Sequence, residues 1–124
     1  PIITGREGMI RLLEKLSSSK RASFLAILKG FGKPGQGLLS FPFAGYTLAL
    51  DIPLHDQQVF TFFKELDELV LKYGGRIYLA KDALMAKEVF QAMYPNNNEF
   101  KRIKNSLDPN HQFSSSMARR LDIG

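Results

Sequence analysis

Residues 45–75, GYTLALDIPLHDQQVFTFFKELDELVLKYGG, contain the change in hydrophobic period that decides the fold class. Up to residue 52 apolar and polar side chains alternate, which is typical of a strand with two unlike faces. From Val59 onward the apolar residues recur every three or four positions, which is typical of an amphipathic helix. The stretch therefore predicts a strand followed by a helix, with Asp56 as the N-cap and Gly74 as the C-terminal glycine.

The predicted strand has one apolar face and one small, polar face. The apolar face carries Tyr46, Leu48, Leu50 and Ile52. The other face carries Thr47, Ala49 and Asp51. Because successive side chains of a strand point to opposite sides, we expect the apolar face to pack in the core and the second face to be open to a partner or a ligand.

Further elements on both sides complete an α+β domain. The sequence predicts a helix in residues 6–16 and strands in residues 23–32 and 76–80. A second helix is predicted from Asp82 to Pro95, with four residues facing the core: Met85, Val89, Phe90 and Met93. A short helix is predicted to end at the Asp108-Pro109 turn. The tail from His111 has little periodic signal. This order predicts the α+β class, with a small, mostly antiparallel sheet and helices packed on one face.

Length and charge limit the classes of function. At 124 residues and 14.0 kDa the chain fits one domain and is small for a complete cofactor enzyme. The formal net charge of +5 is spread over basic residues that stand beside acidic ones, so we expect no nucleic acid as a partner. No apolar run reaches the roughly 18 residues of a transmembrane segment, and the first residues lack the pattern of a secretory signal. We expect a cytoplasmic or membrane-peripheral protein.

The motifs of common catalytic and metal sites are missing. The sequence has no G-x-G-x-x-G, no P-loop and no H-E-x-x-H. It has no cysteine, and His55 and His111 lack metal-ligand spacing, so no metal site is predicted. We interpret His55 as a loop residue rather than a catalytic base, and Asp67 and Glu68 as the solvated face of their helix.

Three longer stretches resemble a known family of enzymes. They are LSFPFAGYTLALDIP (39–53), LDELVLKYGGRIYLAKDALMAKEVFQAMYP (66–95) and LDPNHQFSSSMARRLDI (107–123). In this order and at these separations the chain is similar, from about Ser23 to its end, to the C-terminal part of FAD-linked oxidases of the vanillyl-alcohol-oxidase type.

The resemblance implies that residues 1–124 form a single ferredoxin-like cap domain, the substrate-side part of a flavoenzyme whose N-terminal FAD-binding domain is absent from this chain. That domain would then be the partner, and FAD the cofactor of the full-length protein. The implied reaction oxidises a sugar alcohol, or a polyprenyl-phospho-sugar alcohol, to a ketone by hydride transfer to flavin N5. Glycine-rich loops of the absent domain would hold the pyrophosphate, which agrees with the lack of a phosphate cradle here.

The resemblance also implies roles for five residues. Lys81 in YLAKD corresponds to a lysine near the pyrimidine edge of the flavin, where a cation would stabilise the negative charge that develops during reduction. Lys81 is therefore the expected catalytic residue and, with Tyr78, the expected cofactor-binding pair. Lys29, Thr47 and Ala49 correspond to positions that bind substrate. Asn and Cys occur in the family where this chain has Thr47 and Ala49, so the resemblance leaves the exact substrate open.

Each of these roles has a plainer alternative. Lys81 and Lys29 can be ordinary solvated lysines. Arg119 and Arg120 either pin the tail to the FAD-binding domain or only solvate it. For the whole chain, the alternative is a stand-alone α+β interaction module without redox chemistry, since a fold does not fix a function.

The missing phosphate cradle predicts that the chain alone binds no flavin. We expect the purified 124-residue chain to be colourless, because a dinucleotide needs backbone donors around its pyrophosphate to be held. The measurement is a visible absorbance spectrum after purification, followed by titration with FAD. Binding of FAD at micromolar concentration would contradict this prediction.

Overall fold

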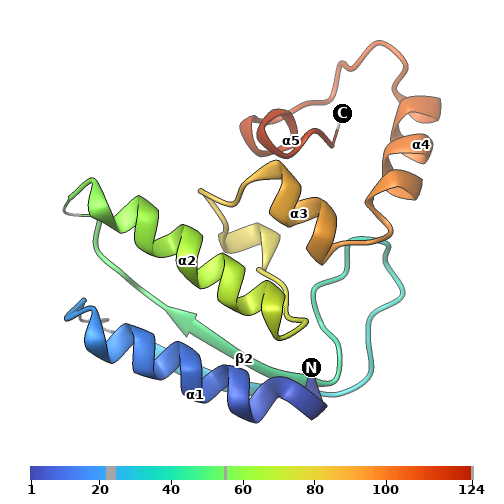
Figure 1. Ribbon diagram of the computed structural model, residues 1–124. Coiled ribbons are helices and arrows are strands. Elements are labelled where there is room, and N and C mark those ends of the chain that lie inside the picture. The colour runs from blue at the N-terminus through green and yellow to red at the C-terminus, as the bar shows by residue number, and fades with distance from the viewer. Residues whose placement is uncertain (22–24, 55, 124) are drawn as a thin grey trace.

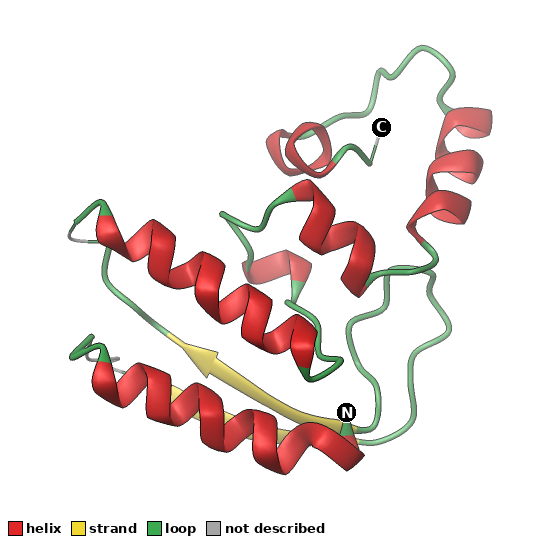
Figure 2. Ribbon diagram, viewed as in Figure 1, coloured by secondary structure: helices red, strands yellow, loops and turns green. Residues whose placement is uncertain are grey.

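The computed structural model describes residues 1–21, 25–54 and 56–123. Its elements, in chain order, are α1 (Ile2–Ser18), β1 (Ala26–Phe31), β2 (Gly45–Leu50), α2 (Gln58–Lys72), a 3-10 turn η1 (Leu79–Lys81), α3 (Lys87–Met93), α4 (Asn97–Leu107) and α5 (Ser116–Leu121). The interpretation of His55 lies outside the described residues, as does the start of the strand predicted from residue 23. Helices and a small antiparallel sheet together confirm the predicted α+β class (Figures 1 and 2).

The sheet of the described residues is an antiparallel pair, β1 and β2, joined by a long loop. In its register Lys29 is the partner of Thr47, and Ile27 is the partner of Ala49. Directly paired residues of an antiparallel sheet point to the same side. The predicted substrate residues Lys29, Thr47 and Ala49 therefore share one face of the sheet.

Helix α1 covers the opposite face of β2 and also packs against α2 (Figure 1). A Cβ added at Gly5 would lie 3.1 Å from the ring of Tyr46, and one added at Gly8 would lie 3.1 Å from Tyr73. The hydroxyl of Thr4 donates a hydrogen bond to the carbonyl of Tyr73 (2.6 Å). Small residues thus let α1 approach both neighbours closely, and the helix extends further toward the N-terminus than the predicted 6–16.

The predicted C-terminal end of α2 is confirmed, whereas its N-cap is Gln57 and not the predicted Asp56. A carboxylate oxygen of Asp56 accepts a hydrogen bond from the backbone N–H of Val59 (3.0 Å), which satisfies one of the free donors at the start of the helix. At the other end Gly74 has a φ of 70°, and its N–H donates to the carbonyl of Leu71 (2.9 Å). A positive φ is a conformation that glycine adopts without strain, so this position ends the helix.

The strand predicted over residues 76–80 was wrong. Residues 75–78 run without a strand partner, and the chain then forms η1 (Figure 2). The carbonyl of Ile77 accepts a hydrogen bond from the hydroxyl of Tyr94 (2.6 Å), a side chain of the segment that follows α3. A short apolar run fits a strand and an extended connection equally well, because periodicity cannot separate the two over so few residues.

The helix predicted to begin at Asp82 begins instead at Lys87, with Ala86 as its N-cap. Asp82 still caps backbone donors, since one of its carboxylate oxygens accepts from the N–H groups of Leu84 (3.0 Å) and Met85 (2.9 Å). These bonds close a turn rather than a helix. The prediction mistook an Asp-capped turn for a helix start because both use the same side-chain bond.

The main core lies between α3 and the end of the chain. Its buried residues are Met85, Phe90, Met93, Tyr94, Leu121 and Ile123. This confirms the predicted core positions of α3, with Val89 partly buried against the cluster. The interpretation of the tail was wrong, because Ser115 caps α5 and the residues after it supply two members of the core.

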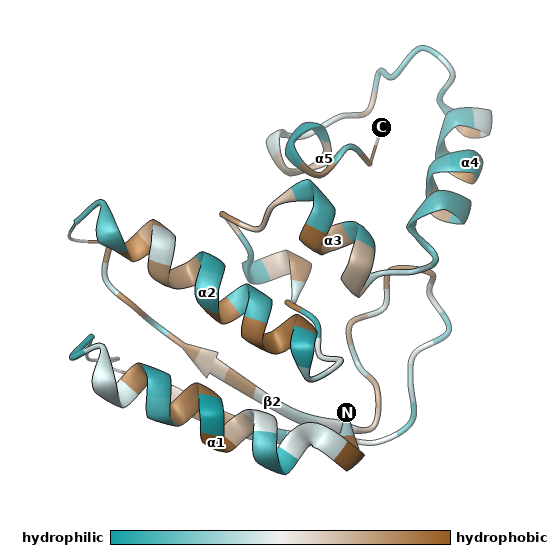
Figure 3. Ribbon diagram, viewed as in Figure 1, coloured by the Kyte–Doolittle hydropathy of each residue, from teal (hydrophilic) through white to brown (hydrophobic). Residues whose placement is uncertain are grey.

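Helix α4 matches its prediction and ends at Leu107, before the Asp108-Pro109 turn. Figure 3 shows this helix largely in hydrophilic colours, in keeping with its place beside the core rather than within it. The carboxylate of Asp108 closes the turn by accepting from Lys104 Nζ (3.0 Å) and from the N–H groups of Gln112 (2.8 Å) and Phe113 (3.0 Å).

An ion pair fixes the C-terminal segment to the turn that follows η1. Arg120 donates to a carboxylate oxygen of Asp82 (2.7 Å) and to the carbonyl of Met85. The Asp82 side chain is only 5% exposed. Arg119 is exposed and donates only to the hydroxyls of Ser114 and Ser116. Arg120 therefore does more than solvate the tail, because it binds a carboxylate of the chain itself, and its contact with an FAD-binding domain stays a prediction.

This ion pair predicts unequal effects of two adjacent substitutions. We expect Arg120→Ala to lower the free energy of unfolding by about 3 kcal/mol, because it leaves the buried carboxylate of Asp82 without its cation. Arg119→Ala is the matched control and should change it by less than about 0.5 kcal/mol. Urea unfolding followed by circular dichroism measures both. Equal effects of the two substitutions would contradict the assigned role of the pair.

Candidate functional site

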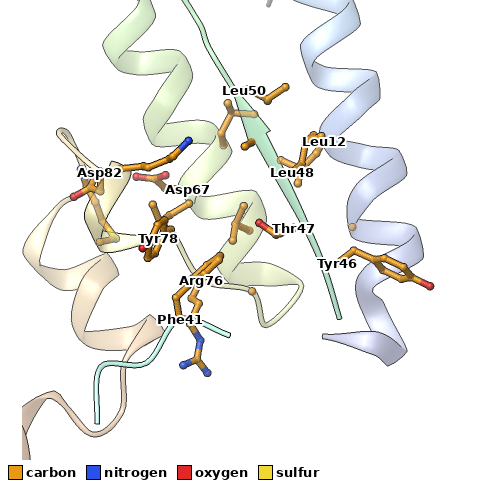
Figure 4. A pocket seen from close by; sticks show the side chains of 18 of the residues that line it. Leu12, Phe41, Tyr46, Thr47, Leu48, Leu50, Asp67, Arg76, Tyr78 and Asp82 are labelled. Carbon is orange, nitrogen blue, oxygen red and sulfur yellow. Dashed lines mark hydrogen bonds between the residues drawn. The ribbon is translucent and has the colours of Figure 1, made fainter. Parts of the chain in front are cut away.

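A cavity of about 1110 Å³ lies between the β1–β2 sheet, α1, α2, the loop before β2 and the segment 75–85. Most of the side chains on its wall are apolar, and a few polar groups from different elements reach it. Figure 4 shows part of this wall, with β2 on one side and Tyr78, Asp67 and Asp82 on the other. An apolar hollow with a few convergent polar groups is the usual form of a small-molecule site.

The cavity brings together all five residues to which the sequence assigned a role. Its wall includes Lys29, Thr47, Ala49, Tyr78 and Lys81. These residues come from three segments of the chain, and the longest separation between them exceeds fifty positions in sequence. The structure therefore places the expected cofactor residues and the expected substrate residues around the same space.

The expected substrate residues lie on the sheet face opposite to the one that α1 covers. Thr47 and Ala49 are half-buried there, and Lys29, paired with Thr47, is exposed. In Figure 4 Thr47 lies on the side of β2 that faces Tyr78, whereas the ring of Tyr46 points away. This arrangement sets a hydroxyl and an ammonium group beside each other, with the small side chain of Ala49 leaving room next to them.

Aromatic rings line the cavity between the sheet and Tyr78. Phe31 meets Phe41 edge to face, with ring centres 5.8 Å apart. Phe41 in turn lies 4.9 Å from the ring of Tyr78, at an angle of 35°. This row crosses from the end of β1 to the segment after α2, so it fixes the Tyr78 ring while leaving it 45% exposed.

Arg76 is a cation of the cavity wall that the sequence prediction did not assign. Its guanidinium lies 4.3 Å from the ring centre of Phe43 and 5.3 Å from that of Tyr94. It also donates a hydrogen bond to the carbonyl of Ser40 (3.0 Å). These contacts tie the loop before β2 to the segment after α2, so Arg76 stabilises the wall.

Lys81 is the last residue of η1 and is exposed. Its backbone N–H donates to the carbonyl of Tyr78 (3.0 Å), and the next residue, Asp82, is held by Arg120. Within the described part of the chain its ammonium group forms no ion pair. The backbone of Lys81 is thus fixed on both sides, while its side chain is free to reach a group in the cavity.

Asp67 also lines the cavity, which corrects its interpretation as part of the solvated face of α2. It is half-buried, whereas its neighbour Glu68 is exposed as predicted. The sequence holds a signal for this position: Phe63, Leu66, Asp67 and Val70 follow the helical spacing of one face. A carboxylate inside an apolar stripe is a candidate for a site, and this stripe faces the cavity and not the solvent.

The surroundings of Asp67 raise its pKa to about 6. Burial is the main cause, because it disfavours the charged form, and the negative charges of Asp82 and Glu68 act in the same direction. The positive charge of Arg120 opposes them. Asp67 therefore changes its charge closer to neutral pH than an ordinary aspartate does.

In residues 1–21, 25–54 and 56–123 no group of three or more His, Asp or Glu side chains could hold a metal ion. None of the helices described has the length and apolar character that crossing a membrane requires.

The fold and the cavity define an α+β domain with a small-molecule site, and comparison with known proteins gives its family. The family model of D-arabinono-1,4-lactone oxidase matches residues 48–121, which include the end of β2, α2 and the helices up to α5. The match covers more than half of the chain. The chain belongs to this family.

Curated relatives agree with the family. The chain is 42% identical, over 90% of its length, to decaprenylphosphoryl-beta-D-ribose oxidase of Mycolicibacterium smegmatis. It is 36% identical, over 96%, to an uncharacterized Streptomyces coelicolor protein in the mprA 5′ region, and 22% identical, over 98%, to L-gulono-1,4-lactone dehydrogenase of Mycobacterium tuberculosis. The matches cover 24%, 33% and 28% of these relatives, so the chain spans a third of their length or less. The named enzymes are oxidoreductases.

The raised pKa of Asp67 predicts a fall in stability with rising pH. Between the ordinary value of 3.8 and about 6 the folded chain binds more protons than the unfolded chain, so the free energy of unfolding decreases through this window. With allowance for solvent screening we expect a decrease of about 1–2 kcal/mol between pH 4.5 and 7. Asp67→Asn should remove it, as measured by urea unfolding at several pH values.

Glu68→Gln is the comparison for this experiment: it removes only the smallest of the charges that act on Asp67, so it should keep most of the parental pH dependence. Asp122 contributes in the opposite direction, because hydrogen bonds from Lys87 and Lys101 lower its pKa to about 2. Its contribution is lost only as the pH falls below about 4, which lies outside the window used here. An Asp67→Asn variant with the parental pH dependence would contradict the prediction.

Proposed function

We propose that this chain is the cap domain, the substrate-side part, of an FAD-dependent oxidoreductase that oxidises a sugar alcohol or a polyprenyl-phospho-sugar alcohol to a ketone. The observation that carries the proposal is the convergence of Lys29, Thr47, Ala49, Tyr78 and Lys81 on one cavity. The family and the names of the relatives support the class of reaction, since these names describe oxidoreductases that act on sugar derivatives.

The residues at the cavity suit a flavin ring placed against it from outside. Tyr78 offers a half-exposed aromatic face that Phe41 holds in place, and Lys81 offers an ammonium group with no ion-pair partner among the described side chains. An aromatic ring system with an electron-rich edge needs these two kinds of contact. When bound, FAD would accept at N5 the hydride that leaves the substrate carbon. The sequence offers no cradle for its pyrophosphate, so an N-terminal FAD-binding domain of the full-length protein is the proposed partner.

The roles of the individual residues follow from their positions. Lys81 would stabilise negative charge that develops opposite it during the reaction, as a preorganised cation does in a site from which water is excluded. Lys29 and Thr47 would hold a polar group of the substrate, and Ala49 would leave space beside it. The apolar walls would exclude water and accommodate a prenyl chain or the sugar ring.

The proposed role of Lys81 predicts a loss of rate without a loss of fold. In the full-length holoenzyme we expect Lys81→Met to slow flavin reduction by about 10²–10³-fold, because one preorganised donor that faces developing charge has an effect of this size. Stopped-flow absorbance with the alcohol substrate in excess measures the rate.

Lys64→Met is the matched control, since Lys64 is an exposed residue of α2 that does not line the cavity. It should reduce its flavin at the parental rate. Thermal unfolding of both variants should change little, as is usual for an exposed side chain. If the Lys81→Met enzyme also reduces its flavin at the parental rate, the proposed role is wrong and Lys81 is an ordinary surface charge.

A further inference from the structure

Asp67 is a carboxylate of the cavity wall that the proposed reaction leaves without a role. It lies on α2 between Leu66, which is buried, and the exposed Glu68, and it projects into the space that Tyr78 and Asp82 also border (Figure 4). No hydrogen bond or ion pair joins its side chain to another described residue. Both of its oxygens are therefore available as hydrogen-bond acceptors.

An unpaired carboxylate at this depth destabilises the isolated chain. Burial raises the pKa of Asp67, which means that the protein holds its charged form at a cost in free energy. An apolar side chain would fit the stripe of Phe63, Leu66 and Val70 without that cost. A residue that is less stabilising than the alternative at its position is expected where it binds a ligand.

The neighbouring cations do not satisfy Asp67. Arg120 is close enough to lower the pKa of Asp67, but its guanidinium already donates to Asp82 and to the carbonyl of Met85. Lys81 lines the same cavity and forms no ion pair with it. A donor from a ligand in the cavity would satisfy it, and the described residues supply no set of side chains for a metal ion. A neutral hydroxyl group is the donor that a sugar brings.

We propose that Asp67 accepts a hydrogen bond from a ring hydroxyl of the sugar substrate, other than the hydroxyl that is oxidised, and so determines which sugars the site accepts. This inference rests on the proposed function. A hydrogen bond from a hydroxyl to a carboxylate is charge-assisted and short, and a site built for a hydroxyl rejects analogues that lack it.

The same charge orients a phosphorylated substrate. The carboxylate of Asp67 repels a phosphate, whereas Lys29, on the sheet face of the cavity, attracts one. A phospho-sugar would therefore lie with its ring hydroxyls toward α2 and its phosphate toward β1. Lys29 would then bind the phosphate of the substrate, and Asp67 would bind a ring hydroxyl at the other end of its polar part.

The test measures binding and rate in the full-length holoenzyme. The probes are a prenylphosphoryl β-D-ribose and its ring-deoxy analogues, each lacking one hydroxyl. Dissociation constants of the analogues come from calorimetry, and the reduction of the flavin is followed separately. The variants are Asp67→Leu, which removes the acceptor, Asp67→Asn, which keeps one neutral acceptor oxygen, and the control Glu68→Gln. Asp67→Leu should fold, because it replaces an unpaired charge in an apolar stripe.

We expect Asp67→Leu to weaken binding of the complete sugar about 10–100-fold, in line with the loss of a hydrogen bond to a charged group. One deoxy analogue should bind the parental enzyme as weakly as it binds Asp67→Leu, because that analogue lacks the hydroxyl that Asp67 accepts from. Asp67→Asn should recover part of the affinity, and Glu68→Gln should behave as the parent.

Two outcomes would overturn the inference and are distinguishable. If the parental enzyme is reduced by its substrate but Asp67→Leu keeps the same affinity for every analogue, Asp67 does not contact the sugar and the proposed function stands. If neither prenylphosphoryl ribose nor D-arabinono-1,4-lactone reduces the parental flavin, the proposed function fails and this inference fails with it.

Discussion

The ion pair between Arg120 and Asp82 is the interaction on which the arrangement of the site depends. The segment 75–85 has no strand partner among the described residues, so regular hydrogen bonding does not fix its place. What holds its C-terminal part, residues 82–85, is a nearly buried carboxylate that binds two backbone N–H groups and a guanidinium from the end of the chain. A buried charge that loses its partner is strongly destabilising. The position of Lys81, one residue before Asp82, therefore depends on a helix nearly forty residues further along the chain.

Sequence periodicity predicted the elements whose apolar residues recur over many positions. The long amphipathic pattern of α2 gave its type, Gly74 gave its C-terminal end, and the alternation in β2 gave the side on which Thr47 and Ala49 lie. The errors fall on short segments. RIYLA is too short to distinguish a strand from an extended connection, and α5 is a six-residue helix that packing against the core, rather than its own sequence, stabilises.

In the site too, residues marked by long stretches of sequence were found, whereas single residues without such a context were missed. The resemblance spanned three stretches of sequence, and the five residues that it marked all reach one cavity. Asp67 was missed because a helix has a core face and a solvent face, and a carboxylate is ordinarily assigned to the latter. The sequence shows that Asp67 lies within the apolar stripe of its helix. It does not show that the sheet and the segment after α2 pack opposite this stripe and make it the wall of a cavity. Arg76 was missed for a related reason, since its aromatic neighbours come from distant loops.

The register of the two strands has a consequence for how this site can evolve. Lys29 and Thr47 are cross-strand partners, so they share a face only while the pairing is kept. One residue inserted within β1 would send its lysine to the far side of the sheet, because side chains alternate with a period of two. The connection between the strands carries no such constraint, and chain-closure entropy grows only slowly with loop length. Related sequences should therefore differ in length between residues 32 and 38, before the part of the loop that lines the cavity, while tolerating neither insertions nor deletions inside the strands themselves.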